Sequence, residues 1–216
     1  MINLYPLFII SIWITIIFLA SSLAKKYLPE QKELSRKIVH IGTGPIIIIA
    51  WSLQISKLLS VVTASLITIG LIINYRFRVF GAIEDIKRKS FGTIAYGLSI
   101  TIILLLFWPE NYAAACFGVL AMAFGDGFAG LIGRNVKSPE WLILKQTKSI
   151  AGTFSMGLIL LILIISIGSI VNIPIKPIQI ILLTLLGILL EQIGPWGIDN
   201  LTVPIGLSYG WIYLMG

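Results

Sequence analysis

Residues 112–134 read YAAACFGVLAMAFGDGFAGLIGR. The apolar run over residues 112–132 is long enough for an α-helix to cross a hydrocarbon core about 30 Å thick. Asp126 interrupts this run near its end, between two glycines. An ionisable side chain in such a helix is costly unless it faces partners or water, so it marks a candidate functional site. Gly125 and Gly127 weaken the helix but let another backbone or a ligand come close. The stretch therefore predicts a membrane helix with a site at one end.

Further apolar segments repeat this pattern along the chain. Of its 216 residues, 57% are hydrophobic and only 12% are charged, whereas a soluble domain has about 25% charged residues. We therefore expect an all-α fold, a polytopic transmembrane bundle of seven to eight spans that forms a single domain over residues 1–216. The expected spans are residues 4–24, 39–53, 58–74, 93–108, 112–132, 150–171, 178–192 and 201–215.

Basic residues distinguish the two ends of these spans. All but two of the 16 lysines and arginines fall in the connections after spans one, three and five, and the exceptions are Lys57 and Lys176. Because lysine and arginine favour cytoplasmic connections, this predicts an N-terminus outside and places Asp126, Glu191 and Asp199 on the cytoplasmic face. The net charge of +7 follows from this bias and from contact with anionic membrane lipids. No nucleic-acid partner is expected, since no soluble basic domain is present.

Cationic residues precede the second span. Residues 36–45 read RKIVHIGTGP, and Arg36 and His40 share a helix face because they are four residues apart. Together with Lys37 they form a cationic face suited to phosphate or substrate contact. For Arg36 and Lys37, topological charge and headgroup contact are the alternative.

Two other helix starts could bind phosphate. Residues 88–93 read RKSFGT, where Ser90 or Thr93 would either cap a helix or help to meet phosphate. Residues 148–156 read KSIAGTFSM, which places a lysine and hydroxyls where a helix start offers free backbone N–H groups. This stretch lacks the Walker A spacing, and positive-inside charge is the alternative for its lysine. The predicted nucleotide-binding residues are Lys148, Ser149, Gly152, Thr153, Arg134 and Asn200.

Acidic residues complete the predicted site. Asp126 shares a helix face with Gly130, and a hydrogen bond between helices is its alternative role. Residues 191–204 read EQIGPWGIDNLTVP, in which Glu191 and Asp199 bracket a Gly/Pro turn. Carboxylate oxygens suit Mg²⁺, so the three acids on one face would supply a base and metal ligands, with Asp126 and Asp199 on the metal. Acids for Mg²⁺ and cations for phosphates predict phosphoryl transfer to a lipid hydroxyl.

The order RKIVHIGTG, GDGFAGLIGR, KSIAGTFSM and DNLTVP, spread over residues 36–204, resembles the phytol kinase branch of the polyprenol and dolichol kinase family. More distantly it is similar to phosphatidate cytidylyltransferases. The resemblance implies CTP as phosphate donor and a long-chain prenyl alcohol as acceptor, with phytol as the expected alcohol. It also places Asp126 and Lys148 in the nucleotide and metal region. Relatives often carry a second acid where this chain has Gly130.

The sequence is thus interpreted as an integral-membrane, CTP-dependent kinase of a prenyl alcohol whose site faces the cytoplasm. In this hypothesis Asp126 binds Mg²⁺–CTP, and Glu191 or Asp199 is a second ligand or the base. The enzymatic alternatives are a kinase of dolichol, farnesol or another polyprenol, and a lipid cytidylyltransferase. The alternative from another class is a small membrane transporter with Asp126 as its ion site, but polar residues cluster at one surface, which favours an enzyme.

Overall fold

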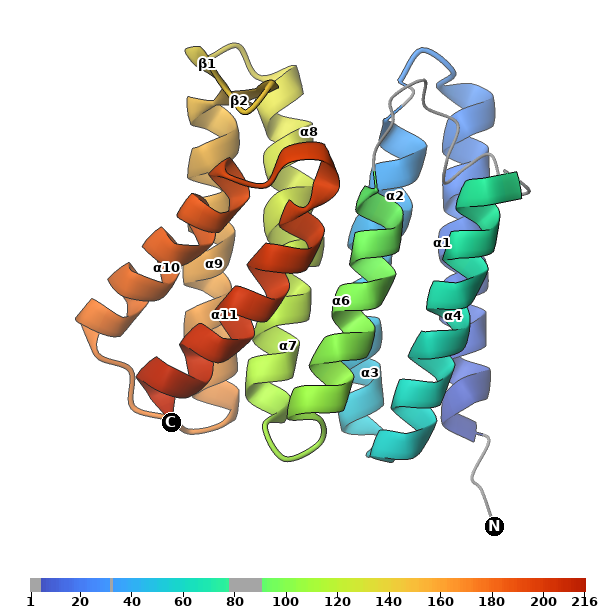
Figure 1. The fold of residues 1–216 in the computed structure, drawn as a ribbon, viewed down its shortest axis with the longest axis vertical. Coiled ribbons are helices and arrows are strands. Elements are labelled where there is room, and N and C mark those ends of the chain that lie inside the picture. The colour runs from blue at the N-terminus through green and yellow to red at the C-terminus, as the bar shows by residue number, and fades with distance from the viewer. Residues whose placement is uncertain (1–4, 32, 78–90) are drawn as a thin grey trace.

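The computed structural model describes residues 5–31, 33–77 and 91–216 as a bundle of helices that stand side by side (Figure 1). The predicted all-α fold is confirmed, whereas the seven to eight spans and their orientation stay a prediction. Residues 88–90 of the predicted RKSFGT stretch lie outside the described residues.

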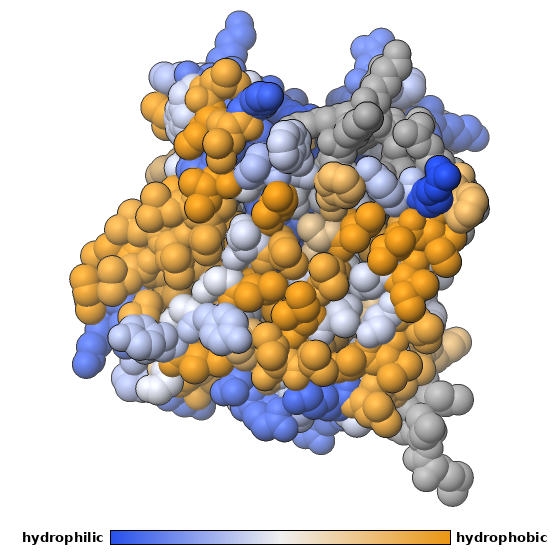
Figure 2. All heavy atoms as spheres, viewed as in Figure 1, coloured by the Kyte–Doolittle hydropathy of each residue, from blue (hydrophilic) through white to orange (hydrophobic). Residues whose placement is uncertain are grey.

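The long helices follow the apolar runs closely. They are α1 (Tyr5–Tyr27), α4 (Lys57–Phe77), α6 (Gly92–Phe107), α9 (Ile150–Ile170), α10 (Pro177–Gln192) and α11 (Asp199–Met215). Within the described residues, four helical stretches are long and apolar enough to cross a membrane, namely α1, α4, Tyr112–Asn135 and α9, while α6 and α10 are shorter apolar helices. Figure 2 shows an apolar belt around the middle of this face, with hydrophilic residues toward both ends.

The second predicted span, residues 39–53, is not one helix. It is divided into α2 (Leu34–Thr43) and α3 (Ile46–Ser52). Pro45 precedes α3 and cannot donate a backbone hydrogen bond, so the helix is interrupted there. At Gly44 a Cβ atom would lie 2.6 Å from the Cβ of Ala123, so the break lets the chain pass close to its neighbour.

The helix that carries Asp126 changes its winding just before that residue. It consists of α7 (Tyr112–Leu120), the π-helical segment η1 (Ala121–Asp126) and α8 (Gly127–Asn135). A π-helical turn shifts the hydrogen-bond register and is frequent at functional sites. Two side chains of α2 bond to carbonyl oxygens of this segment. The Lys37 Nζ donates to the backbone carbonyl oxygen of Asp126 at 3.0 Å, and the His40 Nε2 lies 3.0 Å from the backbone carbonyl oxygen of Met122.

An antiparallel hairpin connects α8 to α9, where the sequence predicted no strand. Its strands are β1 (Glu140–Ile143) and β2 (Gln146–Ser149). Both central residues of its turn have positive φ, 48° at Leu144 and 66° at Lys145, as a type I′ hairpin turn requires. Lys148 therefore lies in a strand and not in a helix. Ser149 ends the strand and caps α9, because its Oγ accepts a hydrogen bond from the Gly152 amide at 3.2 Å.

Helix α11 packs against α7 at a point where no side chain fits. The Ser208 Oγ donates to the Ala114 oxygen at 2.9 Å. A Cβ atom on Gly118 would fall on the Ser208 hydroxyl and the Pro204 carbonyl. Because neither neighbour can move freely, Gly118 sets how closely the two helices approach.

Gly118→Ala is therefore expected to lower the free energy of unfolding by about 1–3 kcal/mol through overpacking. The measurement is the thermal midpoint of the purified protein in detergent. Gly70→Ala on α4 is the matched control, because a Cβ there meets nothing within 4 Å, and its midpoint should not fall. Equal midpoints for the two variants would contradict this account of the α7–α11 contact.

Candidate active site

A polar cavity of about 590 Å³ lies beside the hairpin, between α2, α8, β2, α9, α10 and α11. Its lining includes almost every residue that the sequence predicted for the site: Arg36, Lys37, Asp126, Arg134, Lys148, Ser149, Gly152, Thr153, Glu191, Asp199 and Asn200. His40 is the exception, since it lines an adjacent apolar pocket of about 310 Å³. The fold thus brings charged and polar side chains from distant parts of the chain to one cavity.

Asp126 is held by two side chains of α2. Its Oδ2 lies 3.0 Å from the Lys37 Nζ and 3.2 Å from the His40 Nε2. The His40 Nε2 faces two oxygen acceptors, Asp126 Oδ2 and Met122 O, so this nitrogen carries the proton. The Tyr96 hydroxyl donates to the His40 carbonyl at 2.9 Å and fixes α2 against α6. The interhelical hydrogen bond that was the alternative role of Asp126 is therefore present, as part of a buried charged cluster.

A second buried pair links the hairpin to α10. The Lys148 Nζ forms a salt bridge with Glu191 Oε1 and also donates to the Glu191 carbonyl at 2.8 Å. Gln192 Nε2 donates to the other carboxylate oxygen of Glu191 and to the Thr153 hydroxyl, both at 2.9 Å. Since both oxygens of Glu191 are engaged, this acid is suited to holding Lys148 in place.

Glu33, which the sequence interpretation missed, organises the arginines at the cavity edge. Its carboxylate lies 2.7 Å from Arg36 Nη2 and 3.1 Å from Arg134 Nη1. Burial alone would raise the pKa of Glu33, but the two guanidinium groups outweigh it and hold the pKa below its ordinary value. The spacing of three residues from Arg36 was the one signal in the sequence.

Small residues bring α8 and α9 together at the capped start of α9. A Cβ on Gly152 would lie 2.9 Å from the Ala129 carbonyl oxygen, and one on Gly133 would lie 2.8 Å from the Ser149 Oγ. Ser149 Oγ also donates to the Gly133 carbonyl at 3.3 Å. Gly152 therefore has a packing role. Its amide, like those of Ile150 and Ala151, already has a hydrogen-bond partner, so the free N–H groups predicted for phosphate are not present at these three residues.

Asp199 and Asn200 begin α11 and also line the cavity. Among the described residues, Asp199 forms no salt bridge, and its Oδ1 accepts a hydrogen bond from the Asn200 amide at 3.0 Å. Asp199 lies ahead of the predicted span 201–215, and burial together with the nearby Asp126 carboxylate raises its pKa to about 7. Asn200 Nδ2 donates to the Gly92 carbonyl at 2.9 Å, whereas its buried Oδ1 has no partner in the described part of the chain.

The three acids do not form a ready metal cage. No group of three His, Cys, Asp or Glu side chains within the described ranges could hold a metal ion. Magnesium at nucleotide sites usually takes one or two carboxylates together with substrate phosphates. Asp126 and Asp199 fit this smaller requirement, because the Asp126 carboxylate raises the cost of charge on Asp199 and a cation would relieve it. Glu191 fits it less well, since both of its carboxylate oxygens already have partners, whereas the Lys37 and His40 contacts of Asp126 are both to Oδ2.

Comparison with known proteins gives a consistent result. The chain is 31% identical over 194 residues to the phytol kinase of Synechocystis sp., an alignment that covers 88% of this chain and 83% of that protein. The chain belongs to the phytol and polyprenol kinase family. It is also 30% identical over 146 residues to the chloroplastic farnesol kinase of Arabidopsis thaliana, covering 62% of this chain and 47% of that one. The probable phytol kinase 2 of Glycine max is 31% identical over 132 residues, covering 58% and 43%.

Membership of this family confirms the resemblance seen in the four sequence stretches. The chain spans less than half the length of the two plant relatives. No family model matches the chain, and no solved structure matches it either.

Proposed function

We propose that this chain is a membrane-embedded kinase that transfers the γ-phosphoryl group of CTP to the hydroxyl of a prenyl alcohol, with phytol as the first choice and Mg²⁺ as cofactor. The supporting observation is that lysines, arginines and three acids from distant helices line one cavity, which adjoins an apolar pocket. Relatives named phytol kinase and farnesol kinase support the class of alcohol.

The cationic residues would bind the nucleotide phosphates. Lys148 and the capped start of α9 at Ser149 face the cavity from one side, and Lys37, Arg36 and Arg134 face it from another. Phosphoryl transfer depends mainly on position and on neutralising charge at the phosphate oxygens. The Thr153 hydroxyl would complete the phosphate contacts. The Gly152 amide already bonds to Ser149 Oγ, and the atom of Asn200 without a partner among the described residues is the acceptor Oδ1, which a phosphate oxygen cannot use. When bound, Mg²⁺ would be held by Asp126, with Asp199 nearby, and would neutralise phosphate charge.

Asp199 is the acid best suited to act as base. Both oxygens of Glu191 are engaged and Asp126 is paired with Lys37. Asp199 has no salt bridge among the described residues and accepts one hydrogen bond, from the Asn200 amide, so its carboxylate can receive a proton. The alcohol oxygen would form a bond to the γ-phosphorus as the bond to the β-phosphate oxygen breaks. The alcohol proton passes to Asp199, and the nucleoside diphosphate leaves.

The proposed membrane arrangement keeps the predicted eight spans with the N-terminus outside. In it, α2 and α3 together form the second span, and α6, α10 and α11 also cross the membrane. Both the hairpin and the Asp126 end of its helix then face the cytoplasm, where the nucleotide is available. The basic connections on this side support the orientation through the positive-inside rule.

A direct assay tests the proposed activity. Purified protein in detergent or liposomes is incubated with Mg²⁺, with CTP, ATP, GTP or UTP, and with phytol, geranylgeraniol, farnesol or dolichol. We expect alcohol-dependent formation of phytyl phosphate and CDP, with CTP as the best donor. Release of pyrophosphate with a CMP-lipid would instead identify a cytidylyltransferase. If no nucleotide and alcohol pair gives a phosphorylated product, the kinase proposal is wrong.

A further inference from the structure

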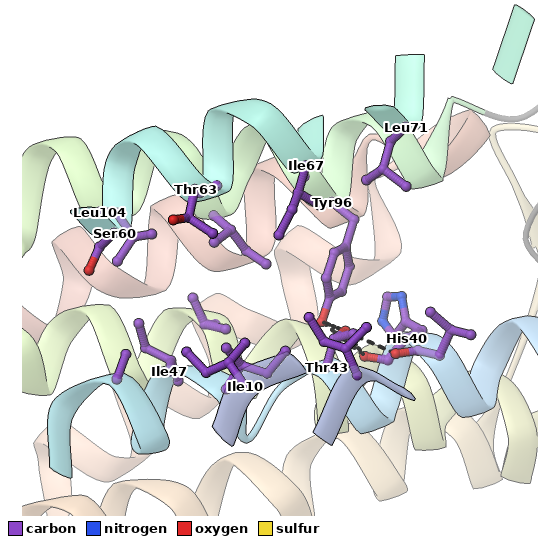
Figure 3. A pocket seen from close by; sticks show the side chains of 18 of the residues that line it. Ile10, His40, Thr43, Ile47, Ser60, Thr63, Ile67, Leu71, Tyr96 and Leu104 are labelled. Atoms are coloured by element: carbon purple, nitrogen blue, oxygen red, sulfur yellow. Dashed lines mark hydrogen bonds between the residues drawn. The ribbon is translucent and has the colours of Figure 1, made fainter. Parts of the chain in front are cut away.

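The apolar pocket has one polar end and one mainly aliphatic end. It lies between α4 and α6 on one side and α1, α2 and α3 on the other. Figure 3 shows His40, Thr43 and Tyr96 at one end, and Ser60, Ile47 and Leu104 at the other. A site with this polarity suits a molecule that has one polar end and a long hydrocarbon chain.

The polar end of the pocket adjoins the polar cavity. Arg36 and Asn200 line both spaces, and His40, which lines the pocket, contacts Asp126, which lines the cavity. The two spaces therefore meet where the phosphate-binding residues and the acids gather. A ligand that fills the pocket would present its polar end to the proposed phosphoryl-transfer site.

We propose that this pocket binds the hydrocarbon chain of the substrate alcohol in an extended conformation. The depth of the pocket then limits the chain to about four isoprene units. This rests on the proposed kinase function and specifies the class of alcohol that the site accepts. Cavities of about 300–1,000 Å³ are typical of small-molecule sites, and this one has about 310 Å³.

The depth follows from the lining residues. On α4 they extend from Leu59 to Leu71 and on α6 from Gly92 to Leu104, which at about 1.5 Å per residue gives about 18 Å along either helix. An extended chain advances about 3.5 Å per three backbone bonds, so 18 Å accommodates about 15 bonds. Each isoprene unit adds four atoms to the main chain, so four units, as in a C20 alcohol, match this depth. A dolichol-length chain is several times too long.

The polar end of the pocket offers a specific hydrogen-bond partner for the hydroxyl of the alcohol. Asn200 is 3% exposed, and its orientation is fixed because the Gly92 carbonyl can only accept, so Nδ2 must face it. Its Oδ1 is then a buried acceptor without a partner among the described residues, and such a group calls for a ligand or water. The alcohol hydroxyl would donate to Oδ1 on binding. During transfer its single proton would leave this hydrogen bond and pass to the neighbouring Asp199 carboxylate.

The first test compares alcohols of increasing length on the unaltered protein. We expect kcat/KM to rise from two to four isoprene units and then to fall at least tenfold at six units or more. Activity that stays level or rises up to dolichol length would overturn the depth limit while leaving the kinase function intact. Absence of activity on every alcohol would instead overturn the proposed function itself.

The second test shortens the pocket from the end that lies away from His40. Ser60 is buried there and its Oγ has no partner within the described residues, so Ser60→Leu removes no hydrogen bond and adds volume. We expect kcat/KM for geranylgeraniol to fall at least tenfold relative to that for farnesol. Ser56→Leu, the same change at an exposed site one turn away that does not line the pocket, should leave this ratio unchanged.

Retained activity on farnesol shows that the Ser60 variant is folded. If Ser60→Leu loses both activities, Ala50→Val adds a smaller volume from the opposite wall on α3 and should shift the same ratio in the same direction. A ratio that neither variant changes would show that the chain does not occupy this pocket.

Discussion

Asp126→Asn is expected to lower kcat of prenyl-alcohol phosphorylation by about 10²–10³-fold, as loss of one preorganised charged group at a transition state does. The amide keeps the shape of the side chain but removes the charge that would hold the metal–nucleotide complex. The carboxylate also fixes Lys37 and His40, at 3.0 and 3.2 Å. The assay measures kcat and the nucleotide KM against Glu110→Gln, an exposed acid that lies outside the cavity lining and should keep full activity.

Stability must be separated from chemistry in this variant. Removing one member of a buried ion pair costs about 3–5 kcal/mol because the other charge is left alone, and Lys37 is only 7% exposed. The double variant Lys37→Met, Asp126→Asn removes both charges, so we expect its thermal midpoint to recover while its activity stays low. Recovery of activity in the double variant would mean that Asp126 serves only to neutralise Lys37.

The apolar runs predicted the long helices well because run length and composition are local properties. Helices α1, α4 and α9 begin and end within a few residues of the expected spans. The break between α2 and α3 was missed because the apolar run continues past Pro45 as a series of isoleucines. The break depends on the backbone N–H that Pro45 lacks, and run length and hydropathy do not register it. The hairpin was missed because its turn uses Leu144 and Lys145, not the Asn-Gly or Asp-Gly pairs that signal positive φ.

The sequence predicted which residues line the site better than it predicted which of them form ion pairs. Rare polar residues in apolar surroundings are costly, so they tend to gather, and the residues chosen on this ground line one cavity. The Lys37–Asp126 and Lys148–Glu191 pairs join residues that are 89 and 43 positions apart, which no spacing rule reaches. These pairings also changed the expected roles, since Glu191 neutralises Lys148 and leaves Asp199 as the acid free of a lysine.

Lys148→Met is expected to lower kcat/KM for the nucleotide by about 100-fold. A hydrogen bond to a charged group is worth about 1.5–3 kcal/mol, and each 1.4 kcal/mol is about tenfold. The loss should appear mainly in the KM for CTP, because the ammonium is proposed to bind phosphate. Lys137→Met is the matched control, since Lys137 is exposed in the same connection and lies outside the cavity lining.

Glu191→Gln distinguishes a phosphate-binding Lys148 from a purely structural one. The amide can still accept a hydrogen bond from Lys148, and the Glu191 carbonyl keeps its contact at 2.8 Å, so the ammonium stays near the cavity with more of its charge available. If Lys148 binds phosphate, Glu191→Gln should cost much less than Lys148→Met in kcat/KM, although both break the same salt bridge. If the salt bridge matters only for joining the hairpin to α10, the two variants should lose activity and thermal stability equally, and the CTP KM should not change in either. A large rise in the CTP KM confined to Lys148→Met would assign this lysine to the nucleotide.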